Sequence, residues 1–181
     1  VMTYKRMTGL SQEAFCDEMF DACLKKAYAE LENMVIYDQL TGVYSMYSFM
    51  EHCKQYDEYN GSVAVVVCDI NHLSDINIQY GQKAGNQALI NVAGVLKKIL
   101  MDRAYIARIN EGNFVAVMKN VTDAEAGKTF EQIKRTVEKE CNNGKFGVTI
   151  EYGIAMRKAS NRWIMDIVHE AVNDMRDRKG R

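Results

Sequence analysis

The first candidate for chemistry is a single carboxylate at the end of the most apolar stretch of the chain. Residues 63–67 read Val-Ala-Val-Val-Val, and Cys68 and Asp69 follow directly. A continuous run of this kind, rich in β-branched residues, predicts a strand that is buried on both faces of a sheet. Asp69 then lies at the carboxyl end of the strand, the edge at which layered α/β folds bind ligands. A carboxylate there can contact a ligand, or it can cap the helix that follows.

Composition and spacing exclude several other kinds of site. The three histidines (52, 72 and 169) are too scattered for a triad or a metal set, and the five cysteines lack a CxxC spacing, which predicts reduced thiols in a cytoplasmic protein. The net charge of -1 favours neither nucleic-acid phosphates nor an anionic membrane as a partner. No apolar run reaches the length that crosses a membrane, and no signal peptide opens the chain.

Periodic patterns predict the elements around Asp69. Apolar residues at helical spacing predict helices over residues 13–36, 46–59, 73–80, 84–101, 123–141 and 161–178. Strand patterns cover residues 63–69, 103–109, 113–118 and 146–156, with a hairpin tip at 110–113. After two leading helices the order is therefore βαββαβ, followed by a last helix. This order predicts an α+β fold, an α/β sandwich in which helices flank a mostly antiparallel sheet.

Four stretches, in the right order, resemble the signatures of GGDEF domains, the diguanylate cyclases. Residues 69–86 read DINHLSDINIQYGQKAGN, where family members read D-I-D-x-F-K-x-I-N-D-x-x-G-H-x-x-G-D. Residues 38–42 read DQLTG, which is similar to the D-x-L-T-G that opens these domains, and residues 146–155 resemble a strand that ends in S-I-G-I-A. Residues 108–114 read RINEGNF, where R-x-G-G-D-E-F should stand. The resemblance implies a GGDEF domain over residues 37–181, with residues 1–36 as an N-terminal helical extension.

What the resemblance implies about chemistry is a reaction whose metal ligands are partly missing. The family joins two GTP molecules, one on each of two facing domains, into cyclic di-GMP, and metal ions offset the charge of the triphosphates. The implied ligands are Asp69, the backbone carbonyl of Ile70 and an acidic residue at the third position of the GGDEF turn. Here that position is Gly112, and Asn113 takes the place of the fourth, usually acidic, residue. The resemblance therefore implies a degenerate domain that is catalytically inactive.

The first two glycines of the GGDEF turn are replaced by Asn110 and Glu111. Glu111 could restore a carboxylate, and then the domain would be an active cyclase. It lies one residue early, however, and side chains alternate between the two sides of a regular strand, which would point Glu111 away from Asp69. A turn could relax that rule.

The positions that bind the guanine base in the family are half kept. Asn77 matches the family asparagine, whereas Asn86 replaces an aspartate that accepts hydrogen bonds from the base, and an amide offers only one acceptor atom. Gly81 and Gly85 match family glycines that meet backbone requirements. The late basic residues Arg176 and Arg178 are candidates for phosphate contacts. These residues also allow a second interpretation, a nucleotide sensor that binds GTP, with Mg²⁺ as the cofactor if it does.

We therefore expect a regulatory or interaction module of cyclic-di-GMP signalling, in the cytoplasm. The helix over residues 13–36 either packs on its own domain or forms a homodimer as a signalling helix. The chain begins at Val1 in mid-pattern, so we expect the other domains of a longer signalling protein beside it. We expect no nucleic-acid partner and no membrane-spanning segment in this chain.

Overall fold

The computed structural model describes residues 12–142, 146–158 and 162–180. The chain divides into two compact units, Val1–Ile36 and Tyr37–Arg181. In the first unit the described residues form one helix, α2 (Gln12–Ile36). Its side chains from residue 18 to 35 are all exposed. Among the described helices, none combines the length and the apolarity needed to span a bilayer.

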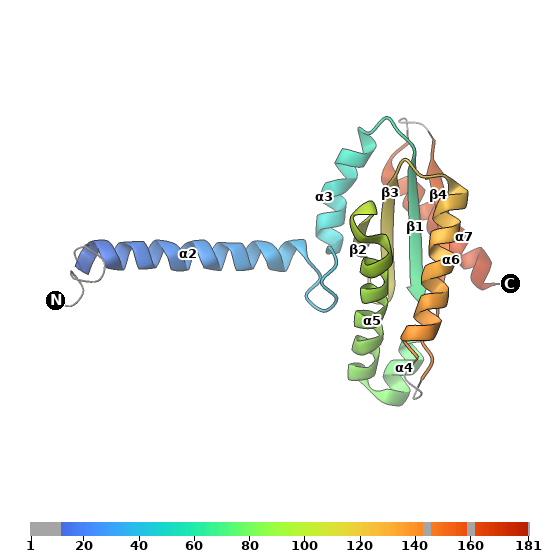
Figure 1. Cartoon of the computed structure of the whole chain (residues 1–181), viewed down its shortest axis with the longest axis horizontal. Helices are drawn as coiled ribbons and strands as arrows, with labels where there is room; N and C mark the ends of the chain where they lie inside the picture. The colour runs from blue at the N-terminus through green and yellow to red at the C-terminus, as the bar shows by residue number, and fades with distance from the viewer. Residues whose placement is uncertain (1–11, 143–145, 159–161, 181) are drawn as a thin grey trace. The chain divides into compact units, whose positions relative to one another are not determined.

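The second unit is built on a four-stranded sheet with the order β2-β3-β1-β4 (Figure 1). All three strand pairs are antiparallel. The strands are β1 (Val63–Ile70), β2 (Tyr105–Arg108), β3 (Asn113–Lys119) and β4 (Ile150–Arg157). The helices are α3 (Met46–Asp57), α4 (Leu73–Tyr80), α5 (Gln82–Leu100), a 3-10 turn η1 (Met101–Arg103), α6 (Asp123–Glu140) and α7 (Ile164–Lys179). The predicted α+β fold with a βαββαβ core is confirmed.

Two strands begin later than the sequence pattern predicts. β2 starts at Tyr105, not at residue 103, because η1 intervenes and Met101 adopts a positive φ of 45°. β4 starts at Ile150, where pairing with β1 begins, not at residue 146. An alternating pattern reports which side chains face a core, and it does not report where a partner strand becomes available.

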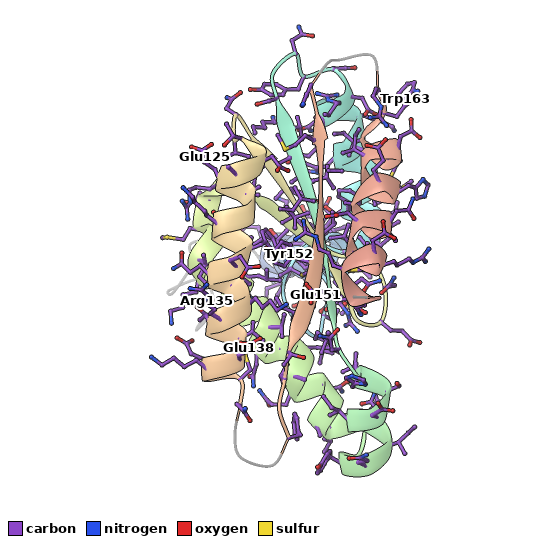
Figure 2. All side chains as sticks on the ribbon, turned by 90° about the vertical axis from the view of Figure 1, so that its right-hand side faces the viewer. Glu125, Arg135, Glu138, Glu151, Tyr152 and Trp163 are labelled. Carbon is purple, nitrogen blue, oxygen red and sulfur yellow. The ribbon has the colours of Figure 1, made fainter. Side chains whose placement is uncertain are left out.

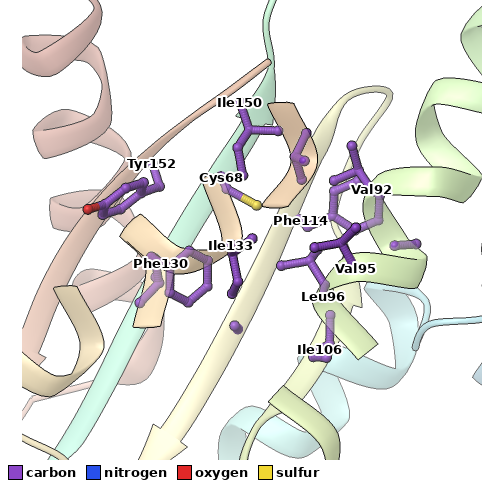
Figure 3. Packing of buried hydrophobic residues seen from close by; sticks show 14 of the residues in the cluster. Cys68, Val92, Val95, Leu96, Ile106, Phe114, Phe130, Ile133, Ile150 and Tyr152 are labelled. Atoms are coloured by element: carbon purple, nitrogen blue, oxygen red, sulfur yellow. The ribbon is translucent and has the colours of Figure 1, made fainter. Parts of the chain in front are cut away.

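The central strand β1 is buried on both faces, as its β-branched run predicts. Residues 63–68 are each at most 1% exposed. Ala64, Val66 and Cys68 face a core shared with α5 and α6, part of which Figure 3 shows around Cys68. Val63, Val65 and Val67 belong to the opposite core, together with residues of α3 and α7. The strand is thus held by helices on both sides, and its last residues emerge at one end of the sheet.

α7 lies directly on the backbone of β4 because Gly153 has no side chain. A Cβ atom at Gly153 would come within 2.1 Å of the carbonyl oxygen of Ala171 and within 2.2 Å of the backbone nitrogen of Met175. Both are backbone atoms of α7 and cannot move aside independently. The glycine therefore fixes how closely the helix approaches the sheet, and with it the place of the last turn of α7.

A buried arginine fixes the other end of α7. Arg157 is fully buried, and its guanidinium donates to the backbone carbonyls of Asp57 at 3.2 Å and of Tyr59 at 2.5 Å. The Asp57 carboxylate in turn accepts from the backbone nitrogen of Ile164, the first residue of α7, at 2.6 Å. The end of α3 and the start of α7 are thereby tied to the same strand.

Replacing Gly153 by alanine should destabilise the domain severely. The added methyl group must displace the backbone of α7, and overpacking typically lowers the unfolding free energy by about 1–3 kcal/mol, with larger losses where backbone has to move. Gly94→Ala is the matched control, because a Cβ atom at this exposed position in α5 meets nothing within 4 Å. Alanine there should raise the unfolding free energy by about 0.5–1 kcal/mol. Urea denaturation of both variants checks this, and equal unfolding free energies would contradict the close approach.

Candidate functional site

The carboxyl end of β1 opens into a cleft of about 430 Å³ next to α4. The structure brings five of the predicted site residues to its wall: Asp69, Ile70, Asn77, Glu111 and Gly112. The other residues of the wall are His72, Leu73, Ser74, Gln82, Leu89 and Arg108. Five other predicted residues are not part of this wall. They lie in α5 or just before it, or in the hairpin of β2 and β3: Gly81, Gly85, Asn86, Asn110 and Asn113.

Asp69 does not present a free carboxylate to the cleft. Its Oδ2 atom accepts from the Nζ atom of Lys179, in the last turn of α7, in a close ion pair. The two side chains are only 27% and 33% exposed, respectively. Lys179 is not among the predicted site residues, because nothing in its spacing reveals that the final helical turn reaches a strand end 110 residues earlier.

Gly112 lies beside the other oxygen of the same carboxylate. A Cβ atom at Gly112 would be 2.9 Å from Oδ1 of Asp69. The next residue, Asn113, is the partner of Asp69 in the register between β1 and β3. The third position of the turn is thus adjacent to Asp69 in space, and a second carboxylate is missing at the point where one would share a cation with it.

The hairpin turn is held by hydrogen bonds of its own. The Oδ1 atom of Asn110 accepts from the backbone nitrogens of Gly112 at 3.3 Å and of Asn113 at 3.0 Å. The Oδ1 atom of Asn113 is buried and has no hydrogen-bond partner among the described residues. Glu111 lies in the turn, outside both strands, and is exposed on the cleft wall. The alternation of a regular strand therefore does not decide where its side chain points.

Arg108 ties this turn to the start of the domain. Its guanidinium donates to the carbonyls of Asn110 at 3.1 Å and Glu111 at 2.8 Å, and to the Asp38 carboxylate at 3.2 Å. Burial alone would raise the pKa of Asp38, but hydrogen bonds from Thr41 and the charge of Arg108 outweigh it and lower that pKa. The guanidinium group of Arg108 is therefore already engaged in a structural ion pair with Asp38.

Asn77 and Gly85 are related by packing. A Cβ atom at Gly85 would be 1.9 Å from the Oδ1 atom of Asn77, so only glycine leaves room for this side chain. That oxygen is buried and has no hydrogen-bond partner among the described residues. Gly81 has a φ of 85°, which favours glycine between α4 and α5. Asn86 is engaged as well, because its Oδ1 atom accepts from Gln82 at 3.2 Å.

Neither of the two late arginines named above lies on the cleft wall. Arg178 donates to Asp174 at 3.0 Å and lies over the ring of Tyr152, 5.2 Å from its centroid. Tyr152 and its neighbour Glu151 are labelled in Figure 2 on β4. Arg176 is exposed. The residue of this turn that reaches the cleft region is Lys179.

In this arrangement the end of β1 offers no free carboxylate to a divalent cation. The described residues contain no group of three or more histidine, cysteine or acidic side chains that could hold a metal ion. Mg²⁺ requires nearly octahedral oxygen coordination at about 2.0–2.1 Å, usually with one or two carboxylates. At this site the half-buried carboxylate of Asp69 is already neutralised by an ammonium group, and the adjacent position is a glycine.

Comparisons with known proteins agree with the fold and the signatures. The family model "Diguanylate cyclase, GGDEF domain" matches residues 35–181. The chain is 31% identical over 128 residues to the uncharacterized protein YhcK of Bacillus subtilis, covering 66% of this chain and 36% of the relative. It is 24% identical over 165 residues to the probable diguanylate cyclase DgcF of Escherichia coli O157:H7, covering 87% of this chain and 35% of the relative.

A solved structure shows the same fold. The coiled coil and GGDEF domain of DgcB from Caulobacter crescentus, in complex with c-di-GMP, matches with a TM-score of 0.82 and 20% identity, covering 94% of this chain and 95% of that one. The chain spans only about a third of the length of the two curated relatives named above, 36% of YhcK and 35% of DgcF. Since the family model covers most of the sequence and the fold agrees, the chain belongs to the GGDEF domain family.

Proposed function

We propose that this GGDEF domain does not synthesise cyclic di-GMP and instead serves as a regulatory or interaction module in cyclic-di-GMP signalling. The observation that carries the proposal is the state of Asp69. Its carboxylate is paired with Lys179, and the neighbouring turn position is Gly112. The signalling context comes from the family and from relatives whose names include a probable diguanylate cyclase and a complex with c-di-GMP.

The proposal follows from the charge that the reaction develops. Condensing two triphosphates concentrates negative charge on the α-phosphate and on the attacking oxygen, and catalysis of phosphoryl transfer consists largely of stabilising that charge. The residues that could do so here are committed elsewhere: Arg108 to Asp38 and the turn, and Lys179 to Asp69. A domain of this kind can keep the fold and its surfaces while losing the reaction.

Incubating the chain with GTP and Mg²⁺ should yield no cyclic di-GMP. Mass spectrometry of the reaction should find no more product than in a heat-denatured control, while cyclic di-GMP added to a parallel sample should be recovered in full. Accumulation of product by the native chain would contradict the proposal. If that activity were lost in Glu111→Ala, Glu111 would be the acid that replaces the missing one.

A second candidate function, binding of GTP without turnover, is supported by the cleft itself. Its volume of about 430 Å³ lies within the range of small-molecule sites, about 300–1,000 Å³. Asn77 lies on its wall with a buried oxygen that has no hydrogen-bond partner in the described part of the chain, and leaving such an acceptor unsatisfied costs about 1–3 kcal/mol. A ligand that supplied a donor would recover part of this cost.

If GTP binds, it should raise the thermal midpoint of the chain, and Asn77→Ala should reduce the shift. Asn173→Ala, at an exposed position of α7 that is not on the cleft wall, is the matched control and should leave the shift unchanged. Differential scanning fluorimetry and titration calorimetry measure both effects. The absence of a shift and of binding heat with millimolar GTP would reject the second candidate.

We further propose that α2 joins two copies of the chain. Phe20, Leu24, Ala27, Leu31 and Met34 recur at alternating spacings of four and three residues, the pattern of a coiled-coil seam. The four large side chains of this set are 41–65% exposed. The matching DgcB structure includes, by its description, a coiled coil as well as the GGDEF domain. A module of this kind would pass a signal through its helices within a longer protein.

Charged residues in this seam should separate the dimer. Sedimentation equilibrium should find a dimer for the native chain and a monomer for Leu24→Glu/Leu31→Glu, because two buried carboxylates per helix cannot be paired there. Ala29→Glu, on the outer side of the same heptad, should remain a dimer. A monomeric native chain, or a double variant that stays dimeric, would show that α2 is not the interface.

A further inference from the structure

We propose that the ammonium group of Lys179 is a built-in replacement for a divalent cation at Asp69, and that Gly112 is the residue that makes room for this replacement. The inference deepens the proposed function, on which it rests, because it names what has taken the place of the metal. The family implies a divalent cation at the end of β1, but the carboxylate there is paired with a lysine and the neighbouring residue is a glycine.

The first step is the geometry of the carboxylate. Lys179 contacts Oδ2 of Asp69, whereas Oδ1 lies 2.9 Å from the position that a Cβ atom of residue 112 would occupy. A side chain at 112 would therefore press on Asp69 and shift it from its partner. The absence of a side chain at Gly112 therefore leaves Asp69 in the position where it pairs with Lys179.

The second step is the balance of charge. The ion pair of Asp69 and Lys179 is neutral by itself, and both side chains are about two-thirds buried or more. Arg108, which lies on the cleft wall, already pairs with Asp38. A divalent cation entering beside Asp69 would meet the ammonium group at close range, and two positive charges a few ångströms apart repel strongly where water is partly excluded.

The third step is the position of Lys179 in the helix. It is the last residue of α7, where the negative end of the helix dipole favours a cation. The approach of α7 is set by Gly153, so the ammonium group is carried to Asp69 by a helix whose placement is fixed by backbone contact. An ammonium ion also needs fewer ligands than Mg²⁺, which suits a site with a single carboxylate.

The test introduces a carboxylate at position 112 by Gly112→Asp and removes the ammonium group by Lys179→Gln. Mn²⁺ alone is titrated into the full chain and followed by the loss of the free-ion paramagnetic resonance signal. The Gly112→Asp variant should bind Mn²⁺ weakly, because the ammonium group of Lys179 stays close to both carboxylates and repels the cation. The Gly112→Asp/Lys179→Gln double variant should bind it at least about tenfold more tightly, since the repulsion is gone. Gly112→Asp/Arg176→Gln removes one positive charge from the same helical turn and should behave like Gly112→Asp.

Equal Mn²⁺ affinity of the double variant and of Gly112→Asp, or no binding by the double variant, would overturn the inference. A second measurement does not depend on residue 112. Lys179→Gln should lower the thermal midpoint of the native chain but should have no further effect in an Asp69→Asn background, and an equal loss in both backgrounds would also overturn it. Formation of cyclic di-GMP by the native chain is a separate result that would reject the proposed function, so the two failures can be told apart.

Discussion

The ion pair between Asp69 and Lys179 is the contact on which the character of this domain depends. It joins the end of the most buried strand to the last turn of the last helix, and it neutralises the one carboxylate that the strand presents to the cleft. A partly exposed ion pair contributes little to stability, because solvent screens it and two side chains must be ordered. Its importance is chemical: it decides which charge is present at the end of β1.

The surrounding structure places the two residues of this pair. Backbone contact at Gly153 sets the distance of α7 from the sheet, and Arg157 with Asp57 sets where the helix begins. On the other side, Arg108 holds the hairpin turn against the start of the domain, which keeps Gly112 beside Asp69. The elements around the pair are thus positioned by contacts between residues of the chain itself.

Most of the fold could be predicted from the sequence, because it follows from local patterns. The β-branched run at 63–67 predicted a strand buried on both faces, and the helical periodicities predicted α2, α4 and α6 to within a few residues. The turn residues Asp38 and Thr41 also carry a local signal, since a carboxylate three residues before a hydroxyl can bond both its hydroxyl and its amide. Strand starts were less accurate, because they depend on where a partner strand is present.

The site could be predicted only in part. Asp69, Asn77, Glu111 and Gly112 were found because motif spacing places them, and the structure does bring them to one cleft. Lys179 was missed, since its partner is distant in sequence and its own neighbours form an ordinary basic helix end. The packing of Asn77 on Gly85 likewise depends on the angle between two helices, which periodicity does not report.

The most direct test of the account is a crystal structure of the native chain grown with GTP and Mn²⁺, with anomalous diffraction used to locate manganese. The account predicts no anomalous peak beside Asp69 and an ammonium group of Lys179 within hydrogen-bond distance of its carboxylate. Manganese ions coordinated by Asp69 next to a bound triphosphate, with Lys179 turned away, would contradict it.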